Sequence, residues 1–206
     1  MDGGWGIGVE AVCHLQCEIS SVEVTGALGC TGDARALFLR CHVPAGGGRT
    51  IQVDSQSAEA HVGDVVSWRD VASLTCDGSA ACVRELVDTR SVVFEMRRRR
   101  RKIMGRTGGS VLVGRAEVAW REVVAVDAGD AAVERRVALT VPALGGGWTL
   151  APVMSVRMSV RVSETAAPVR RSTGSHRETC RGGEWSVGSE DVFGVVAFGV
   201  ADDAGE

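Results

Sequence analysis

The stretch Met154-Ser-Val-Arg-Met-Ser-Val-Arg-Val162 decides the fold. Apolar and polar side chains alternate along it, and every even-numbered residue from Met154 to Val162 is apolar. Because successive side chains of a β-strand point to opposite faces of a sheet, this alternation predicts a strand with one buried face. An amphipathic helix would instead repeat its apolar residues every three to four positions.

Alternation of this kind occurs along most of the chain that precedes this stretch. The other strand-like runs are Val12–Val24, Ala36–Val43, Val65–Cys76, Ser91–Arg97, Val111–Trp120 and Val133–Val141. Glycine-rich segments at 46–48, 105–109 and 145–147 separate several of them. Helical character is confined to Ala80–Leu86 and to one turn after Trp120. Short strands separated by turns predict an all-β protein, an antiparallel sandwich.

The composition is that of a globular protein and limits its function. Hydrophobic residues make up 45% of the 206 residues and charged residues 24%, and the formal net charge is only −3. This charge excludes a protein that coats nucleic acid by its overall charge. The sequence shows no signal peptide and no apolar run long enough to span a bilayer. Together with seven scattered cysteines, these features predict an intracellular, reduced and soluble protein.

The chain is expected to divide into three parts. We expect a flexible N-terminus over residues 1–10, the sandwich over 11–163 and a mostly disordered tail over 164–206, whose first part is polar and aperiodic. A short apolar segment at 192–200 interrupts the tail. It is expected to form an extra edge strand or, alternatively, to bind a protein partner. The residues that would contact this partner are Val192, Phe193, Val195, Val196 and Phe198.

Four segments together carry a family resemblance. They are Ala36–Val43, Ser67-Trp-Arg-Asp-Val-Ala-Ser-Leu74, Val92–Met96 and Leu112–Trp120. Their order and spacing resemble those of a C2 domain, and the last segment is also similar to plant proteins of unassigned function with an amino-terminal C2-like domain. The resemblance implies an eight-stranded antiparallel C2-like β-sandwich with Trp68 in its core. It also implies a phospholipid-binding role in signalling.

The residues that would bind calcium in such a domain are missing. Relatives hold calcium with aspartates from the first and third loops. Here the first loop, residues 25–34, offers only Asp33, and the third, residues 96–109, contains no acid. Since Ca²⁺ takes six to eight oxygen ligands and basic residues occupy the third loop, we expect no calcium binding. No metal or other cofactor is predicted.

No catalytic site is expected either. Cys13 and Cys17 would share one face of a strand while His14 lies on the other, which favours buried thiols over metal ligands. Cys76 and Cys82 are close enough in sequence to pair across a turn, but reduced thiols are favoured. No histidine has a serine or cysteine partner in a nucleophile motif, so the protein is predicted not to be an enzyme.

Positive charge is concentrated in the third loop, which relatives direct at membranes. The residues expected to bind lipid are Arg97, Arg98, Arg99, Arg100, Arg101, Lys102 and Arg106, with Ile103 and Met104 inserting at the interface. Guanidinium groups suit phosphate. We therefore expect calcium-independent binding of anionic membranes that contain phosphoinositide or phosphatidylserine. The protein would be a cytoplasmic, peripherally membrane-associated targeting or adaptor module.

Three alternatives remain open for this run and for the protein. The run is also typical of a nuclear-localisation signal. No aromatic residues are interleaved with its arginines, so sequence-specific nucleic-acid binding is not predicted. It can instead be a solvated loop whose arginines pair with Asp88 and Glu95, and whose arginine content reflects GC-rich coding, since Lys102 is the single lysine. Finally, the protein can be an interaction scaffold that uses a sheet edge or the apolar segment 192–200.

Overall fold

The computed structural model describes residues 9–26, 34–45, 48–100, 109–124, 132–141, 152–168, 185–187 and 196–198. The strands are β1 (Val9–Thr25), β2 (Leu37–Pro44), β3 (Thr50–Ser57), β4 (Glu59–His61), β5 (Val65–Ser79), β6 (Ser91–Arg99), β7 (Ser110–Ala119), β8 (Val133–Ala138), β9 (Val153–Pro168), β10 (Trp185–Val187) and β11 (Val196–Phe198). The helical elements are α1 (Ala80–Thr89) and the 3-10 turns η2 (Ala34–Ala36) and η3 (Trp120–Glu122).

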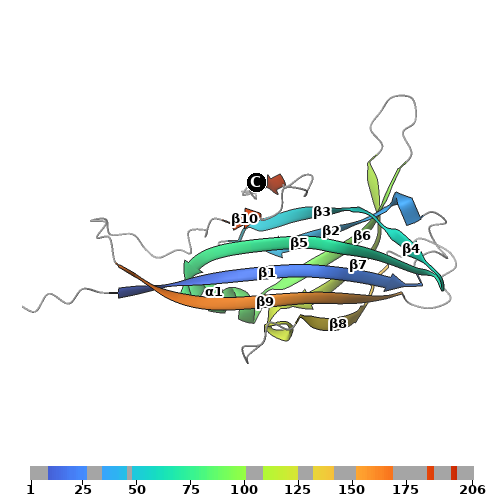
Figure 1. The fold of residues 1–206 in the computed structure, drawn as a ribbon. Coiled ribbons are helices and arrows are strands. Elements are labelled where there is room, and N and C mark those ends of the chain that lie inside the picture. The colour runs from blue at the N-terminus through green and yellow to red at the C-terminus, as the bar shows by residue number, and fades with distance from the viewer. Residues whose placement is uncertain are drawn as a thin grey trace, which may run out of the picture.

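The strands form two antiparallel sheets (Figure 1). Sheet A has the order β10-β5-β1-β9-β8, with β4 also paired to β5, and sheet B has the order β11-β3-β2-β6-β7. Each sheet therefore contains four strands of six residues or more, and β4, β10 and β11 are additions of three residues each. The predicted all-β antiparallel sandwich is confirmed, and its arrangement is consistent with a C2-like fold.

The buried faces of the two sheets form one core. Met154, Val156, Met158 and Val160 are at most 3% exposed, as the alternation along β9 predicts. Val162 departs from this prediction because 42% of its surface is exposed. The expected core position of Trp68 is confirmed, and Trp120 is buried as well. Burial of alternate residues on every long strand is the main source of the stability of this fold.

Some elements differ in extent from the prediction. β3 and β4 were not predicted, because Thr50–Ser57 contains only two apolar residues, Ile51 and Val53. β9 continues to Pro168, five residues beyond the expected end of the sandwich. The predicted helix is confirmed as α1, with three more residues at its C-terminal end, and Ser79 caps it by accepting from the N–H of Cys82. Among the described residues, no helix is long and apolar enough to cross a membrane.

The sandwich closes differently along its two sides. On one side, β7 is joined to the residues that follow β8 by two hydrogen bonds between Arg115 and Thr140, with N–O distances of 2.9 and 2.8 Å. Gly114 packs there against Leu139, whose Cδ2 lies well inside contact distance of the position a Cβ would take on Gly114, with its Cβ and Cγ at 3.4 Å. On the other side, the edge strands β3 and β5 are covered by β11 and β10.

We expect Gly114→Ala to lower the free energy of unfolding by about 1–3 kcal/mol, because the added methyl group would overpack against Leu139. Urea denaturation measures this change. Gly109→Ala is the matched control, since no atom lies within 4 Å of its new Cβ. If both substitutions lowered the free energy of unfolding equally, the close packing of Gly114 against Leu139 would not be the cause of the loss.

Candidate functional site

The basic run begins inside a strand rather than in a loop. Arg97–Arg99 are the last residues of β6, and Arg100 follows them. The backbone N–H of Arg100 donates to the carbonyl of Gly109 at 2.9 Å, so the β6–β7 hairpin continues to this point. The predicted site residues that lie outside the described residues are Arg101, Lys102, Ile103, Met104 and Arg106. The placement of Arg97–Arg99 in the third loop is therefore wrong, because their backbones pair with neighbouring strands.

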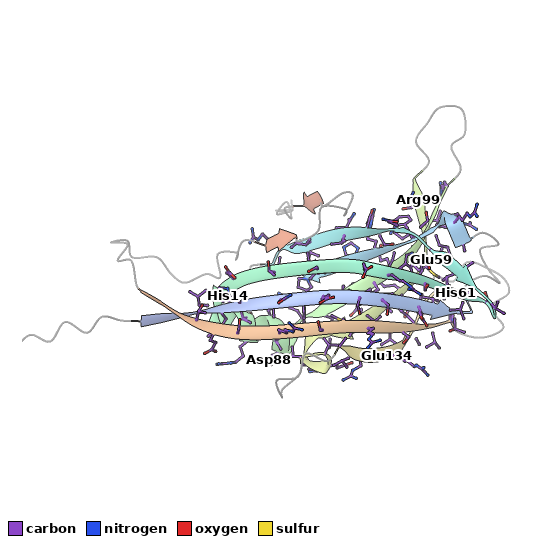
Figure 2. All side chains as sticks on the ribbon, in the orientation of Figure 1. His14, Glu59, His61, Asp88, Arg99 and Glu134 are labelled. Atoms are coloured by element: carbon purple, nitrogen blue, oxygen red, sulfur yellow. The ribbon has the colours of Figure 1, made fainter. Side chains whose placement is uncertain are left out.

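Arg97 is fixed to its own sheet. Its Nη1 donates to Glu95 Oε2 at 2.5 Å, and its Nε donates to Ser110 Oγ at 2.9 Å. His42 Nε2 lies 3.6 Å from the same Glu95 oxygen. The predicted pairing of the run with Glu95 is thus confirmed for Arg97. Pairing with Asp88 is wrong, because Asp88 lies on α1 at the end of the sandwich away from Arg99 (Figure 2).

Arg99 stacks on an aromatic ring that sequence reasoning missed. Its guanidinium carbon lies 5.2 Å from the ring centre of Phe38, and that of Arg40 lies 5.8 Å from the same centre. Arg40 in turn donates two hydrogen bonds to Asp54, at 2.7 and 2.6 Å, which raise the pKa of Arg40. The stacking holds the guanidinium of Arg99 over Phe38 at the outer face of sheet B, while the residue as a whole remains exposed.

Arg98 and Arg100 are the least constrained cations of the run. Both side chains are exposed, and within the described part of the chain neither has an ion-pair partner. Arg98 pairs in register with Leu37, at the beginning of β2. Together with Arg99, these two residues form what we call the basic end: three exposed guanidinium groups at the end of β6.

Exposed apolar side chains lie at the same end of the sandwich. Val62, in the turn between β4 and β5, is fully exposed, and Val153, at the beginning of β9, is 42% exposed. Thr25, the last residue of β1, pairs with both Val65 and Val153. The β4–β5 turn that contains Val62 and the beginning of β9 therefore lie near each other. Glu59 is also exposed here, which means that the surface is not uniformly basic. This end of the sandwich therefore carries both exposed positive charges and exposed apolar side chains.

Four cysteines of the described residues are buried free thiols: Cys13, Cys17, Cys41 and Cys76. Cys13 and Cys17 face the core and His14 faces outward, as predicted. Cys76 is free and does not pair with Cys82, but Cys82 is disulfide-bonded, so the expectation of a reduced thiol there is wrong. Burial raises the pKa of Cys17 to about 12 and that of Cys76 to about 11. Within the described ranges, no three His, Cys, Asp or Glu residues are arranged to hold a metal ion.

Two histidines have hydroxyl partners that the sequence did not reveal. His14 Nδ1 lies 2.5 Å from Asp77 Oδ1, and its Nε2 lies 2.6 Å from Thr165 Oγ1. His61 Nε2 lies 2.6 Å from the buried Ser67 hydroxyl. The two partners of His14 are 63 and 151 residues away in sequence, so no local motif signals them, whereas Ser67 follows His61 by six residues across the β4–β5 turn. The first trio links β5, β1 and β9 on an exposed sheet face.

The outer face of sheet A contains an open hollow of about 680 Å³. It is lined by Glu18, Ser20, Ser21, Glu23, Arg69, Asp70, Ala132, Arg157, Ser159 and Arg161. Three carboxylates and three guanidinium groups face this space, so it does not present a single sign of charge. A surface that attracts an anionic ligand needs an excess of positive charge, which the basic end has and this hollow lacks.

Comparisons with known proteins show a likeness only to solved structures. No protein-family model and no curated protein matches the chain. Among solved structures, it is similar to a chain described under the heading "CC2D1B coordinates ESRCT-III activity during the mitotic reformation of the nuclear envelope", with a TM-score of 0.44 and 12% identity. The similarity covers 71% of this chain and 54% of the other. The strand order of the two sheets, rather than this likeness, carries the fold assignment.

We expect the stability of the protein to fall in alkaline solution. The native state raises the pKa of Cys17 from 9.0 to about 12, so it retains a proton that the unfolded chain releases. This stabilising contribution is complete below pH 9 and is lost as the pH rises toward 12, by up to about 1.4 kcal/mol per pH unit for each such thiol.

Urea unfolding across this pH range tests the expectation. The chain has no tyrosine and a single lysine, so the other groups that titrate there are mainly the buried thiols Cys13, Cys41 and Cys76, whose pKa values are also raised. Cys17→Ala should make the profile shallower by the contribution of one thiol, because that buried thiol is removed. A profile with the same slope in this variant would contradict the assignment to Cys17.

Proposed function

We propose that the protein binds anionic phospholipid membranes without calcium, through the basic end. The observation that carries the proposal is the exposure of Arg98, Arg99 and Arg100 at the end of the sandwich where Val62 is also fully exposed. Guanidinium groups form paired hydrogen bonds to phosphate oxygens, and an apolar tip can enter the headgroup region. The protein would act as a non-catalytic targeting or adaptor module at the cytoplasmic face of a membrane.

The strength of such binding follows from the number of available cations. A basic residue near an anionic leaflet contributes about 1 kcal/mol, so the three arginines of the basic end supply about 3 kcal/mol, or about 100-fold in affinity. Arg97 is not counted, because Glu95 neutralises it. Stacking on Phe38 supports the proposal further, since a guanidinium already held in place loses less conformational entropy when it binds phosphate.

Calcium would have no part in this binding. In the proposed mechanism the guanidinium groups contact lipid phosphate directly, in the place where C2 relatives use a bound cation as a bridge. A divalent cation would compete with these arginines for the phosphate. Chelation should therefore leave binding unchanged or strengthen it slightly.

The triple substitution Arg98→Ala, Arg99→Ala and Arg100→Ala should weaken binding to phosphatidylserine or phosphoinositide vesicles by about 100-fold, with little binding of neutral vesicles by either protein. Co-sedimentation with vesicles, with calcium or chelator and at about 0.1 and about 0.5 M salt, measures this. Wild-type binding should fall steeply at the higher salt concentration.

A matched control removes three exposed arginines from the other end of the sandwich, Arg84, Arg90 and Arg121. The loss of charge is the same, so only the position differs. Equal losses in the two variants would mean that net charge, not the basic end, governs binding. A wild-type protein that does not select anionic vesicles would refute the proposal, and nuclear accumulation lost in the first variant would favour import instead.

Substitution Glu95→Gln should strengthen vesicle binding by up to about fivefold, because it releases the charge of Arg97 close to the basic end. Glu117→Gln is the control, since Glu117 pairs with Arg115 farther along the sheet. The same vesicle assay compares them. Unchanged binding in Glu95→Gln would show that Arg97 does not face the lipid even when its partner is neutral.

A further inference from the structure

The C-terminal part of the chain covers one edge of each sheet. β10 pairs with β5, with Trp185 opposite Cys76 and Val187 opposite Leu74. β11 pairs with β3, with Val196 opposite Gln52. The predicted edge strand within 192–200 is thus confirmed at Val196–Phe198, whereas Val192, Phe193 and Val195 lie outside the described residues.

The two covered edges are neighbours. β3 and β5 contact each other directly, and Arg49, just before β3, lies close enough to Cys76 to oppose the rise in the pKa of its thiol. Both edges therefore belong to one side of the sandwich, where β10 and β11 lie near one another (Figure 1). An uncovered sheet edge presents unpaired N–H and C=O groups and readily adds another strand.

This cover is held much more weakly than the rest of the sheets. β10 and β11 each pair over three residues, whereas β1 pairs with β9 from Val9 to Thr25. A backbone hydrogen bond contributes only about 1 kcal/mol net, so a three-residue strand can leave its edge at a small cost in free energy. The opposite side of the sandwich differs, because Arg115 and Thr140 close it directly.

We propose that β10 and β11 exchange between molecules, so that these two segments of a second copy occupy the edges of β5 and β3. A second copy is the partner that fits, because its segments carry the same residues in the same register. The 16 residues from 169 to 184 separate β9 from β10. Such a length spans at most about 55 Å, enough to reach a neighbouring molecule. Reciprocal exchange leaves no edge uncovered in either copy.

Cysteine pairs placed in register test this exchange in the full-length protein. The single variants Gln52→Cys and Val196→Cys are mixed and incubated with oxidised glutathione, and the products are separated without reductant. Residues 52 and 196 are direct cross-strand partners, at a separation that suits a disulfide. Exchange predicts a covalent heterodimer that increases with protein concentration and disappears on reduction.

The controls make each outcome decisive. Gln56→Cys replaces Gln52→Cys in a second mixture, because Gln56 is exposed on β3 but is not paired with β11. The double variant Gln52→Cys, Val196→Cys tests the register within one chain. A cross-link in the double variant without any heterodimer in the mixture would overturn the proposal and leave the tail as a fixed cover. Equal heterodimer with Gln56→Cys would overturn it too, as would absence of both products.

Discussion

The register of β1 between β5 and β9 is the constraint on which the structure depends. β1 is hydrogen-bonded on both sides, and both pairings shift between Ile19 and Ser21. Against β9 the extra residue is Ser20 of β1, whereas against β5 it lies in β5 between Arg69 and Ala72. A slip of one residue would turn every side chain of a strand to the opposite face. The core position of Cys17 and the outward position of His14 both follow from this register, as does the meeting of three strands at Thr25.

The same alternation divides the run of arginines into groups with different roles. Phe94 and Met96 point inward on β6, so Glu95, Arg97 and Arg99 lie on the outer face of sheet B. On this face Arg97 donates a hydrogen bond to Glu95, and Arg99 stacks on Phe38 of the neighbouring strand β2. A continuous stretch of identical residues is therefore not a uniform patch. Arg97, the first arginine of the run, stabilises the sheet through its ion pair, and only the arginines after it carry charges without a carboxylate partner among the described residues.

Much of the fold is predictable from local pattern, whereas much of the site is not. Alternation identified seven long strands, and the alternative in which arginines of the run pair with nearby acids holds for Arg97 and Glu95. β3 escaped detection because it offers only two apolar positions to the core. Phe38 and the hydroxyl partner of His14 were missed for another reason: they depend on which strands become neighbours, and this is decided by tertiary pairing.

One pairing at the far end of the sandwich bears on how the domain connects to other sequences. Val9 and Pro168 are direct partners, so the chain enters β1 and leaves β9 at the same point. This point lies three residues beyond the pairing of Val12 with Ser79, the residue before α1, at the end opposite Thr25. Apart from the short strands β10 and β11, the sandwich can therefore be inserted into a loop of a host protein, or circularly permuted through a short link, without breaking a strand.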